Sequence, residues 1–403
     1  MHRLAPLLAI VVLALTSCRE SSQGPITIAS QRLDEIGQSL REEAEPLWRT
    51  LLPRTAAGED LRRNADWTRW QARLNAEIDR WLGGFTATGP RADLLRARAY
   101  NMIGDGARAE ALLTRISSQA EGKDPAFRWE RIKALAQQQR WPEVEPLLEQ
   151  AEVESSSWPL PGSDPEEWTL IRMAQALGDP QSGGEAAQAL LTRSPHAEWE
   201  AYRPAWVAAG ALTFASRGRQ VEAHRLCDQG LSRLLDPPGM ELKRLIGTQI
   251  DLIGKSMPPV VVDHWLTAAP SVPAGRTLAV MLALDCPHCL DWLRALQASV
   301  PRLRTRGVEV VAYARLTGHA GARDASARKT LDEAGEIAAR KEQMRQLGIT
   351  LPVGISRDGI IQQDLAVTFL PVCFLSESDQ RISRITLGAL AAPRAVEAVI
   401  GVL

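Results

Sequence analysis

The sequence predicts an α plus α/β protein, in which a long helical-hairpin solenoid precedes a smaller domain of alternating strands and helices. Three observations lead to this fold class. The chain has 403 residues, which is more than one typical domain. Ala, Leu, Arg, Glu and Gln dominate residues 28–255 and recur there in paired helical patterns. Beyond Pro258-Pro259, short apolar runs typical of buried strands alternate with helical segments.

Composition and charge set aside one class of function. Apolar residues make up 45% of the chain and charged residues 24%, which is the balance of a soluble globular protein. The formal net charge is −1, from 47 basic and 48 acidic side chains, and no basic tract stands out. We therefore expect no nucleic-acid binding.

The first residues, 1–18, have the layout of a secretory signal. The apolar stretch from Leu4 to Leu15 is shorter than the roughly 20 residues that span a bilayer. Leu-Thr-Ser-Cys, which ends at Cys18, resembles the bacterial lipobox, whose cysteine becomes the acylated first residue of a lipoprotein. An ordinary cleaved signal with a chance cysteine is the alternative. The resemblance implies a lipid anchor on Cys18, with residues 19–27 as a polar tether. Arg19 rather than Asp follows the cysteine, which in lipoproteins of Gram-negative bacteria implies the periplasmic side of the outer membrane.

Export changes how the cysteines are interpreted. The chain has five, too few for a disulfide scaffold in a protein of this size, although disulfides persist in an oxidising compartment. Cys286 and Cys289 form the one close pair, so we expect this pair to react rather than to brace the fold. Cys227 is predicted to be a core residue. Cys373 is also expected in the core, with a place near the active site as the alternative, because it lies two residues after Pro371.

Residues 28–255 are predicted to form a tetratricopeptide-like helical region. The segment 91–116 has a helix, a turn at Gly104-Asp105-Gly106 and a second helix, and it resembles a tetratricopeptide repeat. Helix pairs that recur about every 34 to 47 residues are the signature of stacked hairpins. The turn and second helix recur more loosely, with departures from the repeat pattern, at 139–150, 178–193 and 218–231.

Ten of the twelve tryptophans lie in this helical region. We expect rings such as those of Trp67, Trp129 and Trp206 to fill the core, because Trp carries a large apolar surface. An aromatic groove for a peptide or glycan is the alternative. The region shows no acid pair, metal cluster or phosphate loop, so we predict a scaffold that binds a partner in an envelope complex.

The remaining residues, 260–403, are predicted to form the α/β domain. Its strands are expected to be buried, and its late hairpin is expected to turn at Glu377 to Gln380. The expected elements are a strand, a helix, a strand, a long polar helix, the hairpin and a closing helix, over residues 276–285, 289–300, 307–316, 324–347, 369–388 and 392–403.

The motif Cys286-Pro287-His288-Cys289 lies where the first strand meets the following helix. Unpaired N–H groups and the helix dipole favour negative charge there. We expect Cys286 to be the nucleophile, with its pKa lowered from about 8.5 to about 3.5–7.5. Pro287 suits a first helical turn, and a protonated His288 would add positive charge beside the sulfur. Cys289, one turn further on, is expected to resolve the mixed disulfide.

Cys-Pro-His-Cys followed by an apolar helix resembles the active site of DsbA-type oxidases, and the wider layout resembles the catalytic domain of DsbC/DsbG-type proteins. The resemblance covers roughly 260–403 and implies a thioredoxin-like fold. In these families a cis-proline before a late strand faces the two cysteines and offers backbone to the substrate. Pro371, preceded by Leu370, matches this position, so the resemblance implies that both residues bind substrate.

Two residues depart from the family pattern. Many thioredoxins carry a buried acid six residues before the first cysteine, where this chain has Val280. Asp285 is adjacent to Cys286 and is expected to tune the site, raising rather than lowering the pKa of its thiol. A helical region also replaces the small dimerisation domain of DsbC-like proteins. The resemblance therefore leaves open whether the site oxidises, reduces or isomerises disulfides.

Two other uses of the cysteine pair stay open. A metal would need ligands beyond Cys286, His288 and Cys289, and the other candidates, His264 and His319, are isolated in the sequence. We therefore expect no metal and no cofactor. A static structural disulfide is the other use, and Pro-His at a helix start argues against it.

Together these features predict a membrane-anchored periplasmic thiol:disulfide oxidoreductase. It would exchange disulfides with protein substrates through Cys286 and Cys289 and would need a redox partner protein. The alternative is a non-catalytic adaptor or assembly lipoprotein of a conjugation or secretion machine, which binds its partners through the helical region.

Overall fold

The structure is a computed structural model of the 403-residue chain. The predicted signal peptide, the predicted lipidation site at Cys18 and the predicted closing helix at 392–403 lie outside the described residues. No described helix is both long enough and apolar enough to cross a membrane. The residues that the structure describes are 25–56, 65–117, 124–154, 165–193, 200, 202–270, 275–320, 329–356, 364–367 and 369–387.

Contacts between residues divide the chain into two compact units, and the division falls within helix α8 (Pro165–Gly178). One unit, which we call the N-terminal unit, comprises residues 2–175 and 192–201. The other, the C-terminal unit, comprises residues 176–191 and 202–403. The last helices of the predicted helical region therefore pack in the same unit as the sheet.

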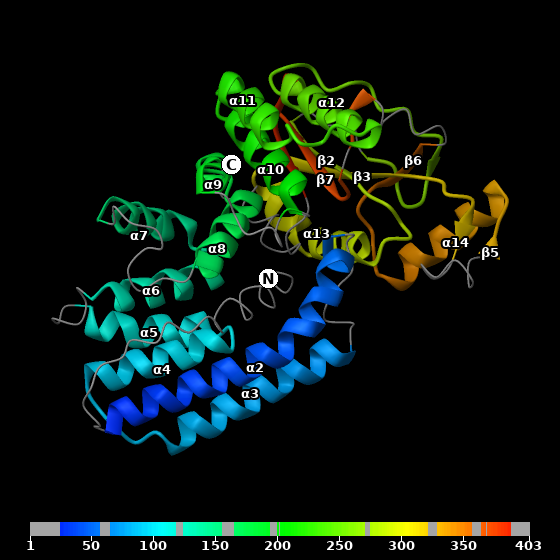
Figure 1. The fold of residues 1–403 in the computed structure, drawn as a ribbon. Helices are drawn as coiled ribbons and strands as arrows, with labels where there is room; N and C mark the ends of the chain where they lie inside the picture. Colours follow the sequence, from blue (N-terminus) through cyan, green and yellow to red (C-terminus); the bar gives the residue numbers. More distant parts are fainter. Residues whose placement is uncertain are drawn as a thin grey trace. The chain divides into compact units, whose positions relative to one another are not determined.

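The N-terminal unit consists of helices that pack against their neighbours in the sequence (Figure 1). Residues 91–116 form the predicted hairpin, in which the Asp105 side chain accepts a hydrogen bond from the amide of Arg108 and caps the second helix. Stacking of the hairpins into a solenoid stays a prediction. The helices are α2 (Pro25–Ala56), α3 (Ala65–Gly84), α4 (Pro90–Met102), α5 (Gly106–Ile116), α6 (Pro125–Gln137) and α7 (Trp141–Glu154).

The tryptophans of the helical region whose side chains the structure describes are buried, which confirms their predicted place in the core. Trp67 and Trp206 are fully buried, and Trp129 is nearly so. The Nε1 group of Trp70 donates to the carbonyl of Leu40 at 2.9 Å, which attaches α3 to α2. These rings act as packing between helices rather than as an exposed aromatic groove.

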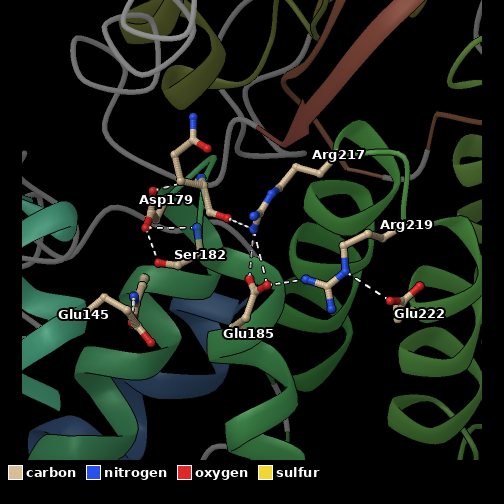
Figure 2. Close-up of polar contacts among 9 residues, drawn as sticks. Glu145, Asp179, Ser182, Glu185, Arg217, Arg219 and Glu222 are labelled. Atoms are coloured by element: carbon tan, nitrogen blue, oxygen red, sulfur yellow. Dashed lines mark hydrogen bonds and ion pairs between the residues drawn. The ribbon is translucent and has the colours of Figure 1, made fainter. Parts of the chain in front are cut away.

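Helices α9 (Gly183–Arg193), α10 (Arg203–Ser216), α11 (Gln220–Gly230) and α12 (Pro237–Leu252) belong to the C-terminal unit, apart from the last two residues of α9. Charged groups join three of them: Glu185 of α9 lies between Arg217 and Arg219, and Arg219 also contacts Glu222 of α11 (Figure 2). The Asp179 side chain accepts from the amide of Ser182 at 3.2 Å, just before α9 begins. Through Arg217 and Arg219, the turn between α10 and α11 is tied to Glu185 of α9.

The sheet of the C-terminal unit has six strands in the order β1-β6-β3-β2-β7-β8. Strands β2, β3 and β6 are parallel, and β1, β7 and β8 pair antiparallel with their neighbours. The chain leaves helix α12 to pair with β8, since the amide of Gly254 donates to the carbonyl of Ile382 at 2.8 Å. The strands are β1 (His264–Trp265), β2 (Arg276–Met281), β3 (Val308–Arg315), β6 (Val353–Ser356), β7 (Val372–Ser376) and β8 (Ile382–Leu387).

Strands β2 and β3 are parallel because helix α13 (Pro287–Thr305) connects them as a crossover and packs on β3. The predicted late hairpin is confirmed as β7 and β8, and the amide of Gln380 donates to the carbonyl of Glu377 at 2.9 Å in its turn. The expected order of strand, helix, strand, helix and hairpin is therefore present.

Two predicted boundaries were wrong. The strand expected over 276–285 ends at Met281, because a turn begins at Ala283. The long polar helix expected over 324–347 is α14 (Glu333–Gln346), because the side chain of Asp332 caps its start by accepting from the amide of Gly335. Short strands β4 (His319–Ala320) and β5 (Lys329–Thr330) pair before it.

Candidate redox site

The first cysteine of the motif lies at the junction between β2 and α13. After Met281, residues 283–286 form a turn in which the amide of Cys286 donates to the carbonyl of Ala283 at 3.2 Å. Cys286 is the N-cap of α13, with extended backbone angles, and its carbonyl accepts the first helical hydrogen bond, from Leu290. The first predicted feature of the site, a cysteine at a strand-to-helix junction, is therefore present.

The two thiols of the motif have different surroundings. Cys286 is partly exposed, Cys289 is fully buried, and neither forms a disulfide. A hydrogen bond between the two side chains, together with burial, raises the pKa of the Cys289 thiol. An accessible thiol therefore lies in contact with a buried, protonated one, which is the arrangement that a nucleophile and a resolving thiol need.

The helix supplies the electrostatics at Cys286. The first N–H groups of a helix have no partner within it, and the helix dipole places partial positive charge at this end. A thiolate at an N-cap is stabilised by both effects. Pro287 and His288 are the first residues of α13, but their side chains lie outside the described ones, so their tuning roles stay predictions. Asp285 is partly buried, and its charge adds to the raised pKa of Cys289.

The predicted substrate-binding residues lie beside this junction along the sheet. The peptide bond between Leu370 and Pro371 is cis, as the family resemblance implies. Pro371 is buried and directly precedes β7, whose first residue, Val372, pairs with Met281 at the end of β2. Neighbouring strands thus bring Pro371 to the end of the sheet from which the turn to Cys286 departs. A substrate contact by Leu370 and Pro371 stays a prediction.

Val280, one departure from the family pattern, and the two described cysteines outside the motif all lie in the core. Val280 is fully buried on β2 and pairs with Ala312 on one side and with Cys373 on the other. Burial raises the pKa of the Cys373 thiol, and it raises that of Cys227 to about 11. Both cysteines therefore occupy the core positions predicted for them, as neutral thiols.

A buried ion pair at the site could not be found from the sequence. Arg340 of α14 donates to the carbonyl of Leu284, two residues before Cys286, at 3.0 Å. Gln343 donates to the same carbonyl at 3.2 Å, and Glu336 is the charge partner of Arg340. In the sequence, Glu and Arg four residues apart on a polar helix are typical of a solvent-exposed pair, so no local signal marked these residues.

The described residues contain no group of three or more His, Cys, Asp and Glu side chains placed to hold a metal. His264 lies 3.1 Å from the carboxylate of Glu333, and His319 is part of β4. Neither is grouped with Cys286 and Cys289 in a ligand set among these residues.

Comparisons with known proteins add little to this geometry. No protein-family model and no curated protein matches the chain. A solved structure described as a candidate thiol:disulfide interchange protein DsbE from Chlorobium tepidum is 19% identical, with a TM-score of 0.26, over 37% of this chain and 96% of that chain. A secreted Mycobacterium tuberculosis disulfide oxidoreductase, described as homologous to E. coli DsbE, is 12% identical, with a TM-score of 0.22, over 31% of this chain and 84% of that chain. Likenesses this weak assign no activity to the chain.

Proposed function

We propose that this protein is a thiol:disulfide oxidoreductase that acts on protein substrates through Cys286 and Cys289. The observation that supports it best is the pair of thiols at the start of α13, one accessible at the N-cap and one buried in hydrogen-bond contact with it. A structural disulfide would not require an accessible nucleophilic position. Leu370 and Pro371 are proposed to contact the substrate chain, and Asp285, Pro287 and His288 to tune the thiols.

The chemistry balances in two exchange steps. The Cys286 thiolate attacks one sulfur of a substrate disulfide, forms a mixed disulfide and releases the other substrate sulfur as a thiolate. Cys289 then loses its proton and attacks the Cys286 sulfur. This forms the Cys286–Cys289 disulfide, and the second substrate sulfur leaves, so the substrate gains two electrons and the site loses two. With an oxidised site the same steps run in reverse, and a redox partner protein restores the starting state.

Trapping tests the proposal. A Cys289→Ala variant retains the nucleophile but not the resolving thiol, so mixed disulfides with envelope proteins should accumulate and appear as reducible bands on non-reducing gels. Cys286→Ala should abolish these bands. Cys227→Ala, which changes a buried core thiol, is the matched control. Like the wild-type protein, it should be active and should accumulate no mixed disulfides.

Trapped bands that persist without Cys286 would contradict the assignment. Complete absence of bands, with partner binding intact after loss of both motif cysteines, would instead favour the adaptor lipoprotein considered from the sequence.

The proposed location is the periplasmic side of the outer membrane, with a lipid on Cys18 as the anchor. The motif that supports a lipid anchor is Leu-Thr-Ser-Cys after a short apolar stretch. A Cys18→Ser variant should leave the membrane fraction and incorporate no labelled fatty acid. Unchanged membrane attachment of this variant would rule out the anchor.

A further inference from the structure

A buried ion pair on α14 extends to the turn that carries Cys286. Glu336 and Arg340 lie one helical turn apart and are only 1% and 3% exposed, with 3.5 Å between Oε1 and Nη2. Taking two charges out of water is costly, and their attraction offsets the cost only when further hydrogen bonds complete the pair. The other partners of these two side chains therefore show which parts of the fold the pair holds.

Arg340 holds backbone carbonyls of two segments. Its Nη1 group donates to the carbonyl of Leu284 at 3.0 Å, and its Nη2 group donates to the carbonyl of His319 at 2.9 Å. The Nε2 group of Gln343, one turn further along α14, donates to the same Leu284 carbonyl at 3.2 Å. A single carbonyl in the turn before the thiol thus accepts two side-chain donors from one helix.

Glu336 anchors the opposite end of the pair. Its carboxylate accepts from the amide and the hydroxyl of Thr317 at 3.1 Å and from the amide of Gly318 at 2.7 Å. These residues follow β3 in the chain. The ion pair therefore joins α14, the segment after β3 and the turn before Cys286. Glu336 holds the pair to the segment after β3, and Arg340 contacts the turn.

The position of Leu284 in the turn gives this contact a consequence. Leu284 is the second residue of the turn 283–286, which the amide of Cys286 closes on the carbonyl of Ala283. The orientation of the central peptide distinguishes type I from type II turns, and its carbonyl is that of the second residue. Two donors on the Leu284 carbonyl select one orientation of this peptide, and hence the path of the chain into Cys286.

We propose that Arg340, together with Gln343, is a positioning residue of the thiol site: it holds the Leu284 carbonyl and so fixes the turn that delivers Cys286 to the N-terminus of α13. This inference deepens the proposed function and rests on Cys286 being the exchanging thiol. Arg340 acts through Leu284, and its charge is balanced by Glu336. Without the contact, the turn can adopt other orientations and the thiolate loses its place at the helix end.

The test measures the pH dependence of Cys286 alkylation by iodoacetamide in reduced full-length protein carrying Cys289→Ala. Arg340→Leu combined with Glu336→Gln removes both charges together. Gln343→Leu removes no charge, but it removes a donor to the Leu284 carbonyl and an acceptor for Nη1 of Arg340. Neither variant changes the net charge, and Gln343→Leu removes no charge at all, so a midpoint shifted in Gln343→Leu reports position and not a nearby charge. Arg345→Gln is the matched control, because Arg345 is exposed on the same helix and pairs with Glu342.

We expect the alkylation midpoint to rise by at least about one pH unit in the double variant, towards the ordinary thiol value of about 8.5. Gln343→Leu should shift it in the same direction by less, and Arg345→Gln should not shift it. An Arg340→Lys variant keeps the charge opposite Glu336 but cannot hold both carbonyls with a planar fork. Its alkylation midpoint should therefore lie between those of the wild type and the double variant.

Unchanged midpoints in both the double variant and Gln343→Leu, with native circular dichroism, would overturn the inference. If the double variant does not fold, Gln343→Leu alone decides. The outcome for the proposed function is separate: it fails if the wild-type midpoint is already ordinary and no mixed disulfide is trapped, and the inference then fails with it. A low wild-type midpoint that no α14 variant moves defeats the inference alone.

Discussion

The described cysteines differ in reactivity because their thiols differ in exposure and position in the fold. Cys227, Cys289 and Cys373 are each no more than 3% exposed, whereas Cys286 is partly exposed at a helix N-cap. Burial raises the pKa of Cys227 to about 11, with the neighbouring Asp228 adding to the effect. Since only a thiolate is nucleophilic, a buried neutral thiol is inert while an exposed one at a helix end reacts.

This contrast predicts selective labelling. At pH 8, iodoacetamide should modify Cys286 in the reduced native protein at least about 100-fold faster than Cys227, as measured on cysteine peptides by mass spectrometry. Unfolding in urea should equalise the two rates. Comparable labelling of Cys227 in the native protein would contradict its place in the core.

The raised pKa of Cys227 also sets the sign of a pH effect on stability. The unfolded chain releases the thiol proton as the pH rises above its ordinary pKa of about 8.5 to 9, while the folded chain holds the proton until about 11. The folded state then binds more protons than the unfolded state, so this contribution is present below pH 9 and is lost as pH rises across the window. The urea midpoint of Cys227→Ala should fall less than that of the wild type across the same range.

At the scale of elements, the sequence predicted what local signals encode. The α4–α5 hairpin follows from a Gly-Asp turn between helical patterns, and Gly104 has the positive φ of 78° that such a turn requires. The turn of the β7–β8 hairpin and the junction at Cys286 were likewise encoded by neighbouring residues. The thiol pair could therefore be identified before the fold was known.

Other elements depend on distant partners and left no such signal. Strand β6 is four residues long and is buried because it pairs with β3 and β1, which come from two other parts of the chain. Its Gly354 lies close to a neighbouring segment, since a Cβ there would be 3.0 Å from the side chain of Val262. Arg340 is the same case at the site: its spacing from Glu336 is typical of a surface pair, yet its side chain is buried and donates to the carbonyls of Leu284 and His319, which are distant in the sequence.

At the scale of the molecule, each compact unit has its own sensitive contacts. In the N-terminal unit, Nζ of Lys133 lies 2.6 Å from Glu130 and 3.3 Å from Glu167, and all three side chains are buried. In the C-terminal unit, α9 and α10 meet at Gly210, where an added Cβ would lie 2.4 Å from that of Ala187. Separate cores of this kind are expected to respond separately to damage.

The last prediction uses one substitution in each unit. Lys133→Met leaves two buried carboxylates without their cation and should destabilise the N-terminal unit by about 3–5 kcal/mol. Gly210→Ala overpacks the contact between α9 and α10 and should destabilise the C-terminal unit by about 1–3 kcal/mol. Gly247→Ala on α12 is the matched control: nothing lies within 4 Å of its added Cβ, so it should be neutral or stabilise by up to about 1 kcal/mol. Hydrogen exchange of peptides measures each unit, and Lys133→Met should leave protection around Cys286 unchanged. Equal loss of protection in both units from either destabilising variant would show that they unfold as one.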